Sequence, residues 1–96
     1  MRPYETVFIL QSDLDEETKE NLLEKIKDVI QKNGGEISQQ ENWGKKKLAY
    51  TINKTHKEGD YYLINFAGDS QVLSELDHVF KMNTEILRSL VVRADQ

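Results

Sequence analysis

The sequence predicts an α+β fold in which two helices and four strands follow the order βαββαβ, within a single domain over residues 1–96. Two segments that lie fifty residues apart carry apolar residues at the same offsets, 0, 1, 4, 7 and 8, which form the stripe of an amphipathic helix. A run of β-branched and aromatic residues precedes and follows each segment, as expected for strands. A chain of 96 residues can bury one core but not two.

The two predicted helices each have one apolar stripe to bury. The stripes consist of Leu22, Leu23, Ile26, Val29 and Ile30 in the first helix, and of Val72, Leu73, Leu76, Val79 and Phe80 in the second. We expect Ser12 and Asp13 to cap the first helix, and the Asn-Gly-Gly sequence at 33–35 to end it. The second helix is expected to begin at Asp69 or Ser70.

Four strand-like runs complete the pattern, at residues 4–10, 36–52, 61–67 and 86–93. With this order of elements, both helices can cover the same face of one antiparallel four-stranded sheet. The sequence therefore predicts the ferredoxin-like architecture.

Alternation of side chains predicts which face of the sheet each residue occupies. Glu5 and Asn65 belong to the odd-numbered sets of the first and third strands, so the even-numbered sets should face the helices. These helix-facing residues are Tyr4, Thr6, Phe8, Leu10, Tyr62, Ile64 and Phe66. The opposite face is left with the apolar residues Val7, Ile9, Tyr61 and Leu63, which neither helix can cover. Such a face indicates a protein partner, and the alternative is a solvated sheet that tolerates a few apolar residues.

The second strand contains a change of alternation. Ile37 is the apolar residue of its first half, whereas Leu48, Tyr50 and Ile52 are those of its second half, so odd and even positions must exchange faces between them. Gly44 lies between the two halves, and a glycine in a strand often marks a bulge. We therefore expect a bulge at Gly44 that redirects the residues after it.

Positive charge is concentrated in one part of this acidic chain. The formal net charge is −4, yet residues 42–57 carry five lysines and no acid, whereas residues 12–41 carry nine acids and four lysines. Lys45, Lys46 and Lys47, here called the lysine strip, follow Trp43 closely. With Lys54 they can neutralise phosphates, while Trp43 offers a stacking surface, and both properties are typical of RNA binding. The alternative is a charged edge strand that discourages aggregation.

Three arginines lie on the first and fourth strands, which are neighbours in the predicted sheet. Arg2, Arg88 and Arg93 are expected to form a second basic patch or to extend the lysine strip. If about three to five phosphates are neutralised, the salt slope is about −2 to −4 and the affinity for RNA is modest. We therefore expect a subunit that binds RNA jointly with another protein.

Catalytic chemistry is not indicated by the residues present. The two histidines, His56 and His78, have no metal-ligand spacing, and the chain contains no cysteine. The acids at residues 15–17 are explained by the positive end of the first helix. The sequence thus predicts no catalytic residue, no metal site, no cofactor and no small-molecule substrate. It also lacks an apolar run of the roughly 20 residues that cross a bilayer and an export signal, so we expect a cytoplasmic protein without a membrane partner.

Four segments, which together span nearly the whole chain, resemble the bacterial small-subunit ribosomal protein S6 family. They are residues 1–5 (MRPYE), 43–50 (WGKKKLAY), 59–62 (GDYY) and 87–93 (LRSLVVR). The resemblance implies a ferredoxin-like fold, assembly into the central domain of small-subunit ribosomal RNA and a heterodimer with ribosomal protein S18. By position it assigns RNA or partner contact to Arg2, Tyr4, Trp43, Lys45, Lys46, Lys47, Arg88 and Arg93.

The chain departs from the family pattern at a few positions. The family often has Pro at the position of Thr51 and Arg at those of Lys46 and Lys47. Lysine replaces the planar fork of arginine with a point charge, so phosphate contact should persist with less geometric specificity.

Two other functions are compatible with the predicted fold. A dimeric ligand-sensing domain would pair through the uncovered face of its sheet, whereas we expect the isolated chain to be a monomer. An enzyme of the acylphosphatase type is less favoured, because no Arg and Asn pair lies in a recognisable phosphate-binding loop.

Overall fold

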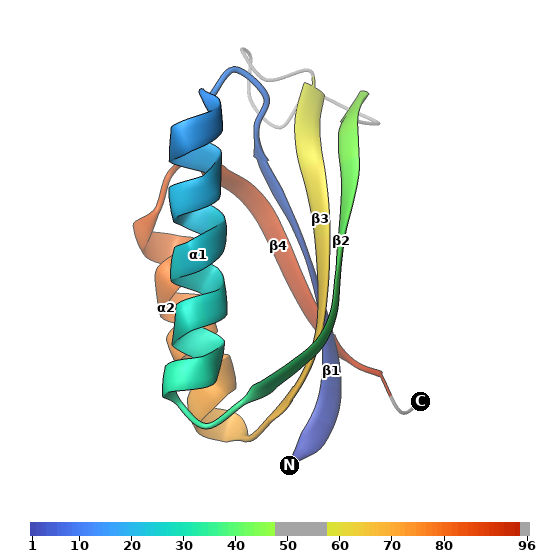
Figure 1. Cartoon of the computed structure of the whole chain (residues 1–96), viewed down its shortest axis with the longest axis vertical. Coiled ribbons are helices and arrows are strands. Elements are labelled where there is room, and N and C mark those ends of the chain that lie inside the picture. Colours follow the sequence, from blue (N-terminus) through green and yellow to red (C-terminus); the bar gives the residue numbers. More distant parts are fainter. Residues whose placement is uncertain (48–57, 95–96) are drawn as a thin grey trace.

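The structure is a computed structural model that describes residues 1–47 and 58–94. Its elements are β1 (Arg2–Gln11), α1 (Glu16–Lys32), β2 (Glu36–Lys47), β3 (Glu58–Gly68), α2 (Ser70–Met82) and β4 (Ile86–Arg93). The strands form one antiparallel sheet in the order β2-β3-β1-β4, with β2 and β4 at its edges. Both helices lie on the same side of this sheet (Figure 1). The predicted ferredoxin-like βαββαβ fold is confirmed.

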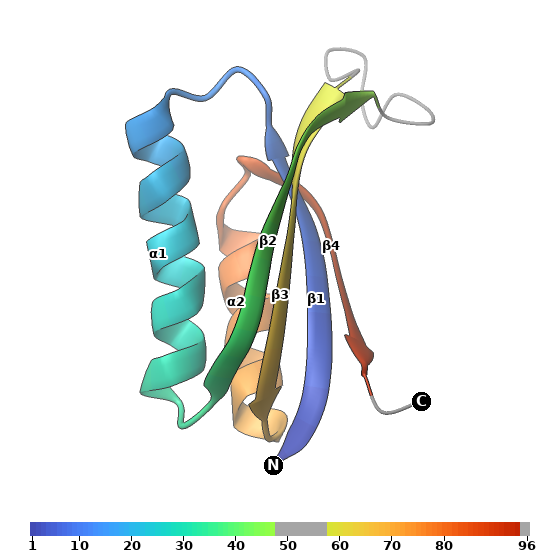
Figure 2. The same ribbon diagram turned by 45° about the vertical axis from the view of Figure 1, so that its right-hand side comes forward.

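The core fills the space between the helices and the sheet, and neither α1 nor α2 lies on the other face of the sheet (Figure 2). The even-numbered residues of β1 and β3 face this core as predicted, and the rings of Phe8 and Tyr62 stack with centroids 5.5 Å apart. Thr6 is the polar residue of the predicted helix-facing set. It is fully buried, and its hydroxyl donates a hydrogen bond of 3.0 Å to the carbonyl oxygen of Leu90 on β4.

Helix α1 begins two to three residues later than its predicted caps imply. Asp15 is the N-cap, and its carboxylate accepts a hydrogen bond of 2.8 Å from the backbone N–H of Thr18. Hydrogen bonds from Thr18 lower the pKa of Asp15. Ser12 and Asp13 lie in the turn between β1 and the helix, so the prediction that they cap it was wrong. The chain needs these residues to cross from the sheet layer to the helix layer.

The other helix ends agree with the sequence. Asp69 caps α2, and its carboxylate accepts a hydrogen bond of 3.1 Å from the N–H of Gln71. Asn33 ends α1, and Gly34 follows it with a positive φ of 88°. The N–H of Gly34 donates to the carbonyl oxygen of Gln31 at 3.1 Å, which satisfies one of the free carbonyls at the end of the helix.

Strand β2 contains two bulges where the sequence predicts one. Its pairing with β3 shifts between Asn42 and Gly44, which confirms the predicted bulge, and also between Ile37 and Gln39. At the first shift the hydroxyl of Ser38 donates to the carbonyl oxygen of Asn65 at 3.2 Å. The helix-facing positions are therefore even-numbered between the two bulges and odd-numbered on either side of them. The predicted exchange of faces between the two halves of the strand is thus absent from its described part. The predicted end of this strand, with Leu48, Tyr50 and Ile52, lies outside the described residues.

Candidate RNA and partner surfaces

The sheet face opposite the helices, here called the open face, is confirmed as the location of Val7, Ile9, Tyr61 and Leu63. They pair across β1 and β3, Val7 with Leu63 and Ile9 with Tyr61. However, Ile9 is only 8% exposed and Leu63 only 6%, because both lie on central strands with neighbours on each side. These two side chains are largely covered by the chain itself.

The exposed apolar surface of the open face lies at the β4 edge. Leu90 pairs with Val7, and Val92 pairs with Glu5, which places both on the open face. Leu90 is 61% exposed and Val92 is 43% exposed. The sequence analysis missed these two residues, although the same alternation could have found them, because Ile86 and Val91 belong to the core side of β4.

The lysine strip occupies the last three positions of β2, at the opposite edge of the sheet. In the pairing with β3, Lys45 lies opposite Asp60, Lys46 opposite Gly59 and Lys47 opposite Glu58. The predicted site residue Lys54 lies outside the described residues. The strip therefore ends one long edge strand, next to the segment that joins β2 to β3.

The bulge before the strip is built from an Asn-Trp-Gly sequence. The side-chain oxygen of Asn42 accepts a hydrogen bond of 2.8 Å from the N–H of Gly44, whose φ of 80° favours glycine. Trp43 is the extra residue of this bulge and is 42% exposed. The bulge thus places an aromatic side chain directly before the lysine strip.

The three arginines do not extend the lysine strip. Arg93 pairs with Tyr4 on the helix side of the sheet, and Arg2 is a diagonal neighbour of this pair at the start of β1. Arg88 pairs with Ile9 on the open face. Since β4 and β2 are opposite edges, three strand spacings, or about 14 Å, separate Arg88 from the strip. Arg2 and Arg93 form one basic group and Arg88 stands on the other face.

Tyr4 is partly buried and is engaged within the chain. Its ring stacks on Phe66, with centroids 5.7 Å apart and an interplanar angle of 28°. One face of the ring therefore packs against the core. The edge of the ring, next to Arg93, is the part of Tyr4 that can contact another molecule.

A buried ion pair joins α1 to the start of β3, opposite the lysine strip. The ammonium of Lys19 on α1 is 2.5 Å from a carboxylate oxygen of Asp60, and the side chains are 12% and 9% exposed. The pKa of Lys19 is raised, mainly by its hydrogen bond to Asp60. The pKa of the adjacent Tyr62 is also raised, mainly by burial. The pair joins the first turns of α1 to the strand opposite the lysine strip.

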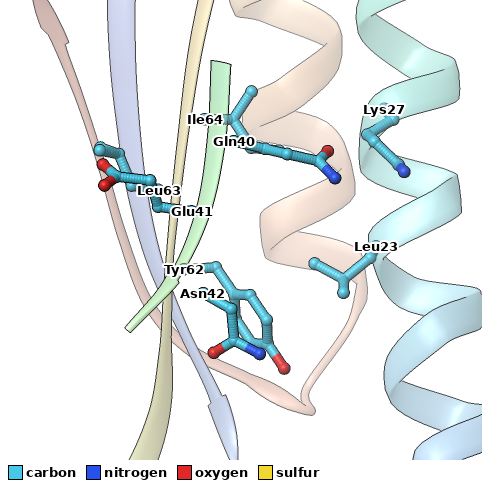
Figure 3. A pocket seen from close by; sticks show the side chains of 8 residues that line it. All are labelled: Leu23, Lys27, Gln40, Glu41, Asn42, Tyr62, Leu63 and Ile64. Carbon is cyan, nitrogen blue, oxygen red and sulfur yellow. The ribbon is translucent and has the colours of Figure 1, made fainter. Parts of the chain in front are cut away.

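Two grooves flank the helices. A groove of about 380 Å³ lies between α1 and β2, and Figure 3 shows Lys27 and Leu23 of α1 facing Gln40, Asn42 and Tyr62 of the sheet. A second groove, of about 330 Å³, lies between α2 and β4 and is lined by Tyr4, Leu73, Asp77, Phe80, Ser89, Leu90, Val91 and Arg93. β2 lines the first groove with the amides of Gln40 and Asn42, whereas apolar and charged side chains of α2 and β4 line the second.

Neither a metal site nor a membrane-spanning helix is found in the described part of the chain. Within residues 1–47 and 58–94, no group of three or more His, Cys, Asp or Glu residues could hold a metal ion. In the same ranges, neither helix is long and apolar enough to cross a membrane.

Comparison with known proteins identifies the family. The family model described as ribosomal protein S6 matches residues 3–93. The chain belongs to the ribosomal protein S6 family. The small ribosomal subunit protein bS6 of Thermoanaerobacter pseudethanolicus is 49% identical, and that of Clostridium acetobutylicum is 46% identical, each over the full length of both chains.

A solved structure agrees with this assignment. The crystal structure of the 30S ribosomal protein S6 from Thermotoga maritima is 40% identical, has a TM-score of 0.89 and covers 96% of this chain and 86% of that one. The S6 family consists of non-enzymatic proteins of the small ribosomal subunit, which act in translation on the cytoplasmic ribosome. The predicted family, its non-enzymatic role and its location are therefore confirmed, and an enzyme of the acylphosphatase type is excluded.

Proposed function

We propose that this ribosomal protein binds the central domain of small-subunit ribosomal RNA together with ribosomal protein S18. The lysine strip, with Trp43 and Lys54, contacts RNA, and the apolar part of the open face contacts the protein partner. The observation that carries this proposal is the separation of the two surfaces, because the lysines end the β2 edge while Leu90 and Val92 lie exposed on the β4 edge.

The distribution of charge explains why both surfaces are needed. The whole chain has a formal net charge of −4, so the lysine strip acts against an overall repulsion from RNA. Three neutralised phosphates give only a modest, salt-sensitive affinity. A partner that covers the open face adds its own RNA contacts, and the joint complex then binds more tightly than either protein alone.

The arginines supply contacts beyond the lysine strip. Arg88 lies on the open face, in the same row across the sheet as Ile9, and borders the partner surface. Arg2, Arg93 and the edge of Tyr4 lie at the far end of the sheet, where they contact either RNA or the partner. The isolated chain is a monomer, because the central part of its open face is already covered.

Neutralising the lysine strip tests the RNA assignment. The triple variant Lys45→Gln, Lys46→Gln and Lys47→Gln should bind the central-domain RNA at least about tenfold more weakly at low salt, and its salt slope should fall by about 2 to 3. Fluorescence anisotropy with labelled RNA measures both quantities, with and without the partner.

A matched control uses three lysines of α1. Lys25→Gln, Lys27→Gln and Lys32→Gln remove the same net charge from a different surface, and RNA affinity should change less than about threefold. Equal losses in the two triple variants would show that only overall charge matters and would refute the assignment of the strip. Tight RNA binding by the isolated chain would refute the joint mode of binding.

A further inference from the structure

Asp60 is the one charged residue that is buried within the described residues, and its position on β3 is unusual. It is 6% exposed and lies opposite Leu10 of β1 on one side and Lys45 of β2 on the other. A carboxylate at this position places a negative charge on the strand opposite the first position of the lysine strip. Such a charge would lower the positive potential that attracts phosphate.

Lys19 offsets this charge from the helix layer. Its ammonium meets the Asp60 carboxylate at 2.5 Å, and both side chains are largely shielded from solvent. Lys19 lies in the first turn of α1, so the ion pair also connects the start of this helix to the start of β3. Stability alone does not account for the pair, because a buried ion pair gains little over apolar residues of the same volume.

We propose that Lys19 is a positioning residue for RNA binding, which holds the Asp60 carboxylate toward α1 and offsets its charge so that the lysine strip keeps its full positive potential. This inference rests on the proposed function. It adds a residue that does not itself contact RNA but affects how strongly the lysine strip attracts phosphate. It predicts that removal of either partner has unequal effects. Loss of Lys19 leaves an unpaired anion opposite Lys45, whereas loss of the Asp60 charge removes the need for Lys19.

Four proteins test the proposal: the original chain, Lys19→Met, Asp60→Asn, and the double variant. Lys19→Met should bind RNA about five- to tenfold more weakly at about 0.1 M salt, which corresponds to the loss of one phosphate contact. Asp60→Asn should bind at least as tightly as the original chain. The double variant should return to within about twofold of the original affinity, because the anion that Lys19 offsets is gone.

Direct contact between Lys19 and RNA gives a different result. In that case the double variant would stay as weak as Lys19→Met, and the proposal would be wrong. If Lys19→Met does not fold, Asp60→Asn and the double variant still decide the question, since Lys19→Met should then have no effect in the D60N background. Lys19→Arg keeps the charge and should bind like the original chain.

Lys27→Met is the matched control. Lys27 also lies on α1, pairs with Glu24 at 3.0 Å, and is distant in sequence from the Asp60 contact. It removes the same charge without exposing a carboxylate next to the strip, so RNA affinity should change less than about twofold. A loss equal to that of Lys19→Met would attribute the effect to net charge alone and would overturn the proposal.

A measurement without RNA separates this proposal from the proposed function. The midpoint of urea denaturation should fall in Lys19→Met, because the Asp60 carboxylate stays buried without its partner, and it should recover in the double variant. An unchanged midpoint in Lys19→Met would show that Lys19 does not offset the Asp60 charge and overturns the proposal whatever the RNA data show. If instead the midpoint shift is found while the strip triple variant still binds RNA normally, the RNA assignment fails and the role of Lys19 toward Asp60 stands.

Discussion

The β2 edge and the β4 edge belong to the same sheet but present opposite surfaces. β2 is 12 residues long, is interrupted by two bulges and ends in the lysine strip. β4 is 8 residues long and exposes Leu90 and Val92 on the open face, with a groove between it and α2 on the other side. One edge suits a polyanion and the other suits a protein.

The two edges also differ in how they are protected against pairing with strands of other molecules. A long, flat edge strand is a template for aggregation, and bulges and charges are the usual protection. β2 has both, and its helix-facing positions Gln40 and Asn42 are amides that water can satisfy. β4 also has a register shift near its start and carries Arg88 and Arg93, but it exposes the apolar side chains of Leu90 and Val92 between these arginines. Exposed apolar side chains on an edge strand favour coverage by a partner.

The largest expected effect is on the β4 edge. Leu90→Asp should weaken the proposed heterodimer with ribosomal protein S18 by at least about 100-fold, because a carboxylate would be buried in an apolar interface. Folding stability should change by less than about 0.5 kcal/mol, since Leu90 is 61% exposed in the chain. Isothermal titration calorimetry and urea denaturation measure the two quantities.

Gln39→Asp is the control for this variant. Gln39 lies at the β2 edge of the open face, in the same row across the sheet as Val92, and receives the same added charge. It should leave the heterodimer within about threefold of the original affinity. If both variants weaken the heterodimer equally, the partner covers the whole open face and the contrast between the edges is wrong for partner binding.

The second effect concerns the bulge of the β2 edge. Gly44→Ala and Gly34→Ala should each cost about 1–2 kcal/mol in the free energy of unfolding, because φ is 80° and 88° and an alanine is strained there. The added Cβ atom would meet no other atom within 4 Å at either place, so the cost comes from the backbone conformation alone. Only Gly44→Ala should also weaken RNA binding, by a few-fold, since it strains the bulge that precedes the lysine strip. Unchanged RNA affinity in Gly44→Ala would show that the bulge does not orient the strip.

The smallest effect is a dependence of stability on alkaline pH. The pKa of Lys19 in the folded chain is raised above its ordinary value of 10.5, so the ion pair contributes fully below about pH 10.5 and is lost as the pH rises through the folded-state pKa. The raised pKa of Tyr62 acts in the same direction. The decline of stability above about pH 10.5 should therefore be less steep in Lys19→Met than in the original chain, as measured by urea denaturation. Equal slopes would contradict the assignment of the pair.

The elements with strong periodicity could be predicted from the sequence. Leu22, Ile26 and Ile30 of α1 and Phe8 and Leu10 of β1 repeat with the period of their element, and all are buried as expected. The cap of α1 was misplaced because Ser12, Asp13 and Asp15 are all good cap residues within four positions. Only the spacing between the sheet and helix layers decides among them.

The surfaces were harder to predict than the core. The bulge at Ser38 was missed because residues 38–42 are polar and carry no alternation that could reveal a shift. The exposed residues Leu90 and Val92 were missed because the open face was inferred from the central strands alone. The role of Asp60 was not apparent at all, since its partner is 41 residues away in the sequence and meets it only in the folded chain.

The two bulges of β2 also restrict how the length of this strand can change. Without the bulge at Ser38, Gln39 and Glu41 would face the helices in place of Gln40 and Asn42. Deleting the extra residue of either bulge removes that bulge and leaves the facing of the remaining positions unchanged. Deleting one residue elsewhere in the strand, with both bulges kept, would reverse the facing of all positions between the deletion and the turn, including those of the lysine strip. A single change of length is therefore tolerated at a bulge, whereas elsewhere before the strip it moves the strip to the other face.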